Sequence, residues 1–294
     1  MVNEKELDGW FSNSKHPIIA ELPAWAEKDS SSLRDFVTSL KGLVDALLVP
    51  DLPTGRIRKD SILTMSRIRS VSDIDLIAGL SARHRSLEAT MSRLLAFWEM
   101  GVRSVYIVMG DATPSSSSNQ YGFSKATELI KITKELIKSW KVPVSKELHD
   151  SSGFKVGSAL LPSRKNECIL LKKKVDAGTD FLITQVIFDP SPLASFLKSC
   201  KVSKIEALPI FVSLPLLSKP SSLSKLESLE GVYLPIEKKA ELLRSDSLEV
   251  KSVEMDIETF KKCKMLNIKK LGAYILPLPG SRMESRLAEE LRKL

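Results

Sequence analysis

The chain has 294 residues, of which 43% are hydrophobic and 27% are charged, with 44 Lys and Arg against 36 Asp and Glu. These proportions are typical of a soluble globular protein and exclude a disordered, collagen-like or coiled-coil chain. No apolar run approaches the roughly 20 residues of a membrane helix, and the N-terminus lacks the basic head and apolar stretch of a secretory signal. We therefore expect a cytoplasmic protein without a membrane partner.

The positive charge narrows the range of partners. A net charge of +8 could attract nucleic acid, anionic lipid or an anionic small ligand. The lysines are spread over expected helices, as in residues 125–135, and aromatic residues make up only 6% of the chain. A single-strand binder interleaves more aromatic residues with its basic ones. We therefore expect no nucleic-acid partner, and some of this charge could attract a phosphate-bearing cofactor.

The three cysteines predict neither a disulfide framework nor a metal site. Cys168, Cys200 and Cys263 are far apart, odd in number and outside any CxxC motif. Disulfide scaffolds and zinc sites ordinarily use paired cysteines at short spacing. This usage fits the expected cytoplasmic location.

Short apolar runs with β-branched residues alternate with amphipathic stretches along the chain. The runs that we expect to be strands are residues 18–22, 46–49, 76–80, 105–109, 156–160, 181–185, 208–212 and 273–276. The stretches that we expect to be helices are residues 32–43, 86–100, 127–140, 168–177, 192–200, 256–266 and 283–294, with an extra helical segment at 235–244.

This alternation predicts the α/β class. Strands that are buried on both faces and separated by helices indicate a parallel sheet, and eight such units favour a closed (β/α)8 barrel. We expect one barrel domain over residues 1–294, with residues 1–14 as an N-terminal extension. The alternative is an open doubly wound sheet, although no GxGxxG follows the first strand.

Polar residues at the ends of the expected strands are the candidate site residues, because barrel enzymes carry their chemistry there. Glu21 interrupts an apolar strand; it is either a general acid with a raised pKa or a rim carboxylate paired with an arginine. Asp111 follows Gly110, which would let the backbone approach a ligand, and could instead be a cap or turn residue. Gln185 suits the edge of a heterocycle, or it bonds to neighbours inside the barrel.

Other candidate residues carry weaker signals. Lys174 lies on an expected helix, where a lone lysine is ordinarily solvated. His84 is flanked by two arginines, as is common at a surface, and His16 and His149 lie in expected loops. The chain contains no Ser-His-Asp order, GxSxG, HExxH or GxxxxGK[ST] motif, which excludes the commonest hydrolase and nucleoside triphosphatase signatures.

Six segments, in this order, resemble the methylenetetrahydrofolate reductase family over roughly residues 15–280. They are Ala20-Glu21-Leu22-Pro23; Pro53-Thr54-Gly55-Arg56; Leu80-Ser81-Ala82-Arg83-His84-Arg85; Gly101-Val102-Arg103-Ser104-Val105 leading to Gly110-Asp111; Lys174-Val175-Asp176-Ala177-Gly178-Thr179-Asp180; and Ile183-Thr184-Gln185 with Phe188-Asp189. Each match is weak by itself, but their order and spacing inside an eight-unit barrel pattern are fairly specific.

The resemblance implies a flavoprotein that reduces the methylene bridge of 5,10-methylenetetrahydrofolate to a methyl group, with FAD as hydride carrier. Glu21 matches the family's general acid. Asp111 matches an aspartate near flavin and pterin, and Gln185 matches a glutamine that contacts the substrate. The positions that the resemblance assigns to FAD are Gly79, Met109, Gly110, Asp111, Ala159 and Lys174. It implies no metal.

The chain departs from the family pattern at four places. The third strand reads Gly79-Leu80-Ser81-Ala82 where His-Leu-Thr-Cys is usual, and Pro50-Asp51 replaces a Thr-Tyr pair. Ala159 stands where some members stack a tyrosine on the flavin, and residues 276–280 lack a substrate-binding arginine. The electron donor therefore stays open between NAD(P)H and a redox protein, and a homo-oligomer or a partner subunit stays open too.

Two alternatives remain at this point. One is a flavin-free barrel enzyme that acts on a phosphorylated or pterin substrate. The other is a non-catalytic subunit that binds a pterin or a redox partner, although a pure binder has no need of a proton donor such as Glu21.

Overall fold

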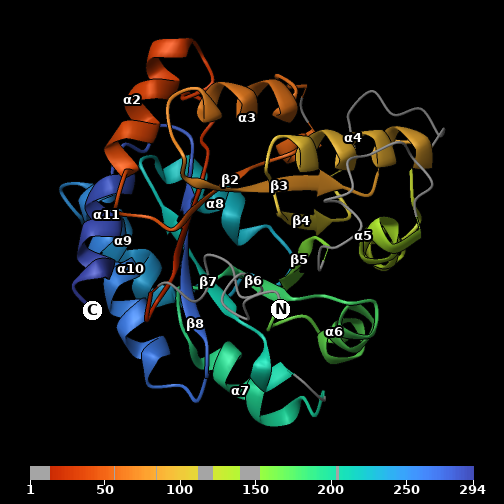
Figure 1. The fold of residues 1–294 in the computed structure, drawn as a ribbon. Helices are drawn as coiled ribbons and strands as arrows, with labels where there is room; N and C mark the ends of the chain where they lie inside the picture. Colours follow the sequence, from red (N-terminus) through yellow and green to blue (C-terminus); the bar gives the residue numbers. More distant parts are fainter. Residues whose placement is uncertain (1–13, 56, 84, 112–121, 140–152, 203–204) are drawn as a thin grey trace.

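The computed structural model describes residues 14–294 except for residues 56, 84, 112–121, 140–152 and 203–204. Eight parallel strands follow one another around a closed barrel, and β8 pairs with β1 to complete it (Figure 1). The strands are β1 (Ile18–Glu21), β2 (Ala46–Val49), β3 (Asp75–Ser81), β4 (Ser104–Val108), β5 (Lys155–Leu160), β6 (Phe181–Val186), β7 (Ile210–Leu216) and β8 (Leu271–Pro277).

Helices surround the barrel and cover the outer face of its strands (Figure 1). They are α2 (Ser30–Leu40), α3 (Ser61–Arg69), α4 (Leu87–Glu99), α5 (Ala126–Ser139), α6 (Glu167–Asp176), α7 (Ser191–Ser199), α8 (Pro220–Glu227), α9 (Ile236–Arg244), α10 (Leu248–Lys264) and α11 (Glu284–Arg292). A short 3-10 turn, η2 (Pro53–Gly55), follows β2, and another, η4 (Ile205–Ala207), precedes β7.

Local sequence explains where several helices begin and end. The Asp29 carboxylate accepts a hydrogen bond from the Ser32 amide at 2.7 Å at the start of α2, and the Ser86 hydroxyl accepts one from Ala89 at the start of α4. These caps satisfy amide groups that have no partner within the helix. Gly101 follows α4 with a φ of +75°, a left-handed conformation that favours glycine.

Two phenylalanines fill the amino end of the barrel interior, and we call them the phenylalanine layer. Phe181 opens β6, Phe211 lies near the start of β7, and their ring centroids are 6.0 Å apart in an edge-to-face arrangement. Glycines make room for them, because a Cβ on Gly157 would lie 2.3 Å from the Phe181 ring and one on Gly272 would lie 2.4 Å from the Phe211 ring. The two adjacent rings are therefore flanked by glycines of β5 and β8, and the side chains pack tightly at this end.

The closed barrel confirms the predicted fold class and the presence of eight strands, and the extra helical segment is α9. The prediction differed in three places. The seventh strand is Ile210–Leu216 rather than residues 208–212, the helices α3 and α8 were not expected, and α10 begins at Leu248, where Ser247 caps it, rather than at residue 256. The predicted extension over residues 1–14 lies almost wholly outside the described residues.

The expectation that no disulfide forms is wrong for two of the three cysteines. Cys168 of α6 and Cys200, which ends α7, are disulfide-bonded with their Cα atoms 5.5 Å apart. The cysteines are 32 residues apart in sequence. The bond joins the start of α6 to the end of α7, the helices before and after β6. Cys263 is a free, buried cysteine, and burial raises the pKa of its thiol to about 12.

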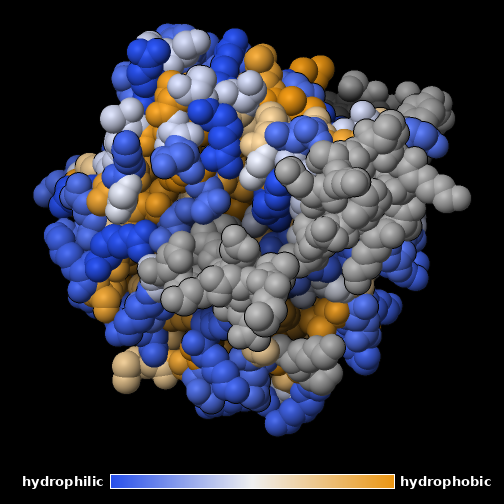
Figure 2. Space-filling model, viewed as in Figure 1, coloured by the Kyte–Doolittle hydropathy of each residue, from blue (hydrophilic) through white to orange (hydrophobic). Residues whose placement is uncertain are grey.

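The surface is mixed in character. Figure 2 shows that hydrophilic side chains cover much of the viewed face outside the grey residues, with apolar side chains in smaller patches among them. None of the helices in the described part of the chain is long and apolar enough to cross a bilayer.

Candidate active site

A cavity of about 450 Å³ opens at the carboxyl end of the barrel, and we call it the mouth cavity. It brings together six of the predicted site residues, which come from the ends of β1, β3, β4 and β6. They are Glu21, Gly79, Met109, Gly110, Asp111 and Gln185. Residues from the β2 loop and from the segment after α8 complete the lining. The structure therefore brings these positions together at the end of the barrel where parallel strands end, and their roles stay predictions.

Glu21 has a tyrosine as its hydrogen-bond partner. The Tyr274 hydroxyl of β8 donates to the Glu21 carboxyl, and within the described part of the chain Glu21 forms no ion pair. Among the described residues, the carboxyl therefore meets a tyrosine and no arginine, and the choice between the two readings of Glu21 stays a prediction. Strand register explains the contact: Tyr274 pairs with Ile19, and Glu21, two residues on, faces the same way.

Burial dominates the electrostatics of this pair. It raises the pKa of the Glu21 carboxyl, while the Tyr274 hydrogen bond and the field of Arg58 lower it by less. Tyr274 and the neighbouring Tyr106 of β4 also have raised pKa values, because burial and the Glu21 charge both disfavour a phenolate. Both tyrosines therefore stay protonated, and Tyr274 can keep donating to Glu21.

A buried ion pair borders the mouth cavity where the family pattern has Thr-Tyr. The Arg85 guanidinium holds the Asp51 carboxylate with two hydrogen bonds, one of them 2.7 Å long, and the Ser81 amide donates to the same carboxylate at 2.9 Å. Only 4% of the Asp51 side chain is exposed. The ion pair fixes the loop after β2 against the end of β3, so it shapes the wall of the cavity.

The two glycines of the cavity wall are required by the protein's own packing. A Cβ on Gly79 would lie 2.8 Å from the Val49 carbonyl oxygen, and one on Gly110 would lie 1.8 Å from the Ser81 hydroxyl. Gly110 also has a φ of +83°. The close approach that we expected at Gly110 is therefore made by Ser81, and it brings the end of β4 against the end of β3.

Gln185 is held at the edge of the cavity by backbone groups. Its side-chain amide donates to the Glu230 carbonyl at 3.0 Å, and its amide oxygen accepts from Val186 at 3.0 Å. Asp111, an exposed residue at the end of β4, lies across the same cavity. The cavity therefore has polar groups at its rim and an apolar wall made largely by Leu48, Leu80 and Val108.

Lys174 and Ala159 lie apart from this cavity lining. The Lys174 ammonium donates to the Ala159 carbonyl at 2.5 Å and pairs at 3.2 Å with Glu167, whose side chain is fully buried. Burial lowers the pKa of Lys174, and Glu167 opposes that change. The expectation of a solvated lysine is therefore wrong, and the assignment of both residues to FAD stays a prediction. His84 lies outside the described residues.

Sequence reasoning missed Tyr106 and Tyr274 as members of the site. Both lie inside predicted strands, where an aromatic residue ordinarily indicates packing. The available signal was register: in a closed barrel β8 returns to β1, so the inward residues of the last strand face those of the first.

The family model for methylenetetrahydrofolate reductase matches residues 43–277. The chain belongs to the methylenetetrahydrofolate reductase family. The match covers most of the barrel, from just before β2 to the end of β8, and confirms the resemblance seen in the sequence. Family membership supports the oxidoreductase class.

Two reductases of this family show how far the chain has diverged. It is 27% identical over 147 residues to "Probable methylenetetrahydrofolate reductase (NADPH)" of Caenorhabditis elegans, a match that covers 50% of this chain and 21% of the relative. It is 25% identical over 179 residues to "5,10-methylenetetrahydrofolate reductase" of Buchnera aphidicola subsp. Schizaphis graminum (strain Sg), over 60% of this chain and 57% of the relative. The chain thus spans about a fifth of the length of the Caenorhabditis elegans relative and somewhat over half of the Buchnera aphidicola relative.

A solved structure from Clostridium thermocellum shares the whole fold. It superposes with a TM-score of 0.69 at 15% sequence identity and covers 99% of both chains. That protein is described as an uncharacterized protein that binds two copies of 5-methyl-5,6,7,8-tetrahydrofolic acid. At this identity the likeness shows the fold of the barrel.

Proposed function

We propose that this chain is a flavin-dependent reductase that converts 5,10-methylenetetrahydrofolate, or a related methylene-tetrahydropterin, to the 5-methyl form. The observation that carries the proposal is the Glu21 carboxyl, which is buried at the mouth of the barrel in the same cavity as Asp111 and Gln185. Family membership supports the reaction class. We further propose that residues 1–294 act as one catalytic domain.

Glu21 is assigned the role of general acid. The methylene bridge must open to an iminium before its carbon can accept a hydride, and opening requires a proton on the departing nitrogen. A carboxyl whose pKa is raised by burial keeps that proton to a higher pH than an exposed carboxyl does, which suits a general acid. The Tyr274 hydroxyl orients the carboxyl before the transfer and stabilises the carboxylate that remains after it.

Asp111 and Gln185 are assigned to the substrate ring. A reduced pterin presents nitrogen donors and a carbonyl acceptor along one edge. A carboxylate accepts from ring N–H groups, while a glutamine amide offers both a donor and an acceptor. Their position across one cavity, with apolar residues between them, supports binding of a planar heterocycle.

The cavity wall fits the ring of FAD. Gly79 and Gly110 contribute no side chain to the wall, and Met109 and Asp111 lie beside them. These four residues would hold the flavin ring, and FAD would supply the hydride when bound. Lys174 and Ala159 are assigned to the cofactor by the family resemblance alone.

The electron donor, the oligomeric state and the location follow as parts of this proposal. We propose NADPH or NADH as the donor, with a redox protein as the alternative, and a cytoplasmic location. A homo-oligomer or a complex with a partner subunit is compatible with the cavity, since the mouth cavity is built from this chain's residues.

An absorbance spectrum tests the proposal. The full chain is incubated with FAD, freed of excess cofactor and mixed anaerobically with 5-methyltetrahydrofolate. We expect flavin bands shifted from those of free FAD that bleach on addition of the folate. NADPH, NADH and dithionite, added separately, then identify the donor. Absence of bound flavin, or bound flavin that only dithionite bleaches, would contradict the reductase.

A flavin-free pterin protein is the second candidate. The observation that favours it is the Lys174 ammonium, which is already paired with Glu167 and does not line the mouth cavity. Calorimetric titration with 5-methyltetrahydrofolate in the absence of FAD separates the two. Tight folate binding by a colourless protein that takes up no FAD would favour the flavin-free enzyme or a non-catalytic pterin-binding subunit.

A further inference from the structure

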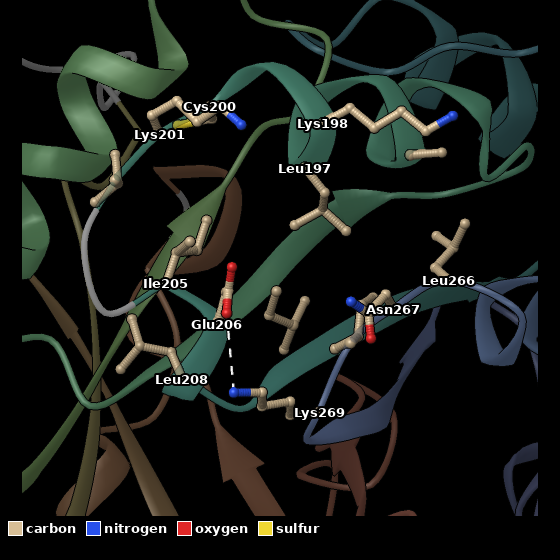
Figure 3. A pocket seen from close by; sticks show the side chains of 14 residues that line it. Leu197, Lys198, Cys200, Lys201, Ile205, Glu206, Leu208, Leu266, Asn267 and Lys269 are labelled. Atoms are coloured by element: carbon tan, nitrogen blue, oxygen red, sulfur yellow. Dashed lines mark ion pairs between the residues drawn. The ribbon is translucent and has the colours of Figure 1, made fainter.

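A second cavity lies at the amino end of the barrel and has a volume of about 290 Å³. It is bounded by the end of α7, by η4 and by the turn from α10 into β8 (Figure 3). It shares no lining residue with the mouth cavity. The amino end of a barrel ordinarily serves stability, so a cavity there needs its own explanation. We call it the lower cavity.

The centre of the lower cavity is apolar. Leu197 points from α7 into the space above β7, and Leu266 approaches from the end of α10 (Figure 3). Ile205 and Leu208 line the side next to η4, and Ile268 contributes from the turn before β8. An aliphatic or aromatic group of a ligand would therefore be removed from water here, which favours binding in proportion to the apolar area covered.

The rim of the lower cavity is positively charged. Lys198 and Lys201 are exposed and form no ion pair with any residue that the structure describes. On the opposite side, Lys269 pairs with Glu206 at 3.8 Å, so that this pair adds no net charge. The rim thus presents two ammonium groups that no described carboxylate neutralises, beside an apolar interior.

We propose that the lower cavity binds a small amphipathic carboxylate, with its apolar chain among the leucines and its carboxylate held by Lys198 and Lys201. The volume favours a small molecule, because it lies just below the roughly 300–1,000 Å³ of ordinary small-ligand pockets. A stable protein partner would instead need about 800 Å² of contact on this chain. The site does not depend on the reductase activity or on FAD.

Calorimetric titration of the full chain with octanoate and with 1-octanol tests the proposal. We expect saturable one-to-one binding of octanoate and weaker binding of the uncharged alcohol. The double change Lys198→Ala and Lys201→Ala should weaken octanoate about tenfold, since each exposed charge contributes a few-fold, and leave the alcohol unchanged. Lys225→Ala, a matched change of an exposed lysine on α8, should alter neither.

A variant of the apolar wall completes the test. Leu197→Asn should weaken both ligands, and a circular dichroism melt would verify that the variant is folded. Octanoate heats that do not saturate, or an octanoate affinity that survives the double lysine change, would overturn the proposal. Self-association that the double lysine change abolishes, without octanoate binding, would assign this surface to a second copy of the chain and overturn it too.

Discussion

The two ends of the barrel interior are built from the same strands and differ in what those strands place inside. At the amino end, the phenylalanine layer and the glycines beside it fill the space with apolar groups. At the carboxyl end, Glu21, Tyr106 and Tyr274 bring ionisable groups into a buried position. Apolar packing lowers the free energy of the folded state, whereas burial of ionisable groups raises it and gives them unusual proton affinities. The amino end therefore contributes mainly to stability, and the carboxyl end carries the groups suited to chemistry.

The largest effect is expected when a substitution removes the proton donor at the carboxyl end. Glu21→Gln keeps the size and a hydrogen-bond acceptor for Tyr274 but cannot supply the proton. We expect turnover of the methylene substrate to fall by about 10²–10⁴, the usual contribution of a general acid, with bound flavin retained. Steady-state kinetics and the flavin spectrum measure both, and Glu289→Gln on the surface of α11 is the matched control. Normal turnover in Glu21→Gln would remove Glu21 from the mechanism.

A substitution at the amino end should instead lower stability and leave the site at the carboxyl end intact. Phe211→Ala leaves a cavity beside Phe181, and we expect the free energy of unfolding to fall by about 3–5 kcal/mol. Folate binding at the mouth should be unchanged below the melting temperature. Urea denaturation measures the loss, and Ile57→Ala, at a side chain that is 93% exposed, should cost less than about 0.5 kcal/mol. Folate binding that is lost along with stability would show that the two ends are coupled.

Another buried carboxyl makes the stability of the protein depend on pH. Glu284, at the start of α11 near Trp25 and Arg282, has a pKa raised by burial from 4.5 to about 7. Between these values the unfolded chain ionises while the folded chain stays protonated, so the contribution of Glu284 to stability falls as pH rises through this window.

Glu284→Gln removes that penalty. We expect the variant to match the natural chain near pH 4.5 and to be more stable by up to about 3 kcal/mol at pH 8. Urea denaturation at the two pH values measures the difference, and Glu289→Gln again serves as control. A stability difference that is equal at both pH values would show that packing, rather than ionisation, is responsible.

The smallest expected effect concerns Tyr274. Its hydrogen bond lowers the pKa of Glu21 against the larger effect of burial, so Tyr274→Phe should raise that pKa further. The general acid works in its protonated form, and the alkaline limb of the kcat/KM profile should therefore move to higher pH. Ile275→Val, a change in the next residue of β8 on the opposite face, should leave the limb in place. An unshifted limb in Tyr274→Phe would mean that the hydroxyl does not act through Glu21.

Much of the site was predictable because strand ends are local features. Glu21 and Gln185 end their apolar runs, and Asp111 follows one, so in a parallel barrel they must meet at the same end. The contact of Lys174 with the Ala159 carbonyl was not predictable, because it forms only after α6 packs on β5. The Cys168–Cys200 bond was missed for the same reason, since a separation of 32 residues carries no information about distance.

The sequence by itself determined the alternation of strand and helix, the barrel and the polar residues at its mouth, because apolar periodicity and strand ends can be read along the chain. Only the tertiary structure decided that Tyr274 donates to Glu21, that Ser81 packs against Gly110, and that Lys198 and Lys201 beside the lower cavity form no ion pair with the described residues. Closure of the barrel brings together Glu21 and Tyr274, which are 253 positions apart. Both the proton affinity of Glu21 and the charge at the lower rim depend on those neighbours, which chain order does not specify.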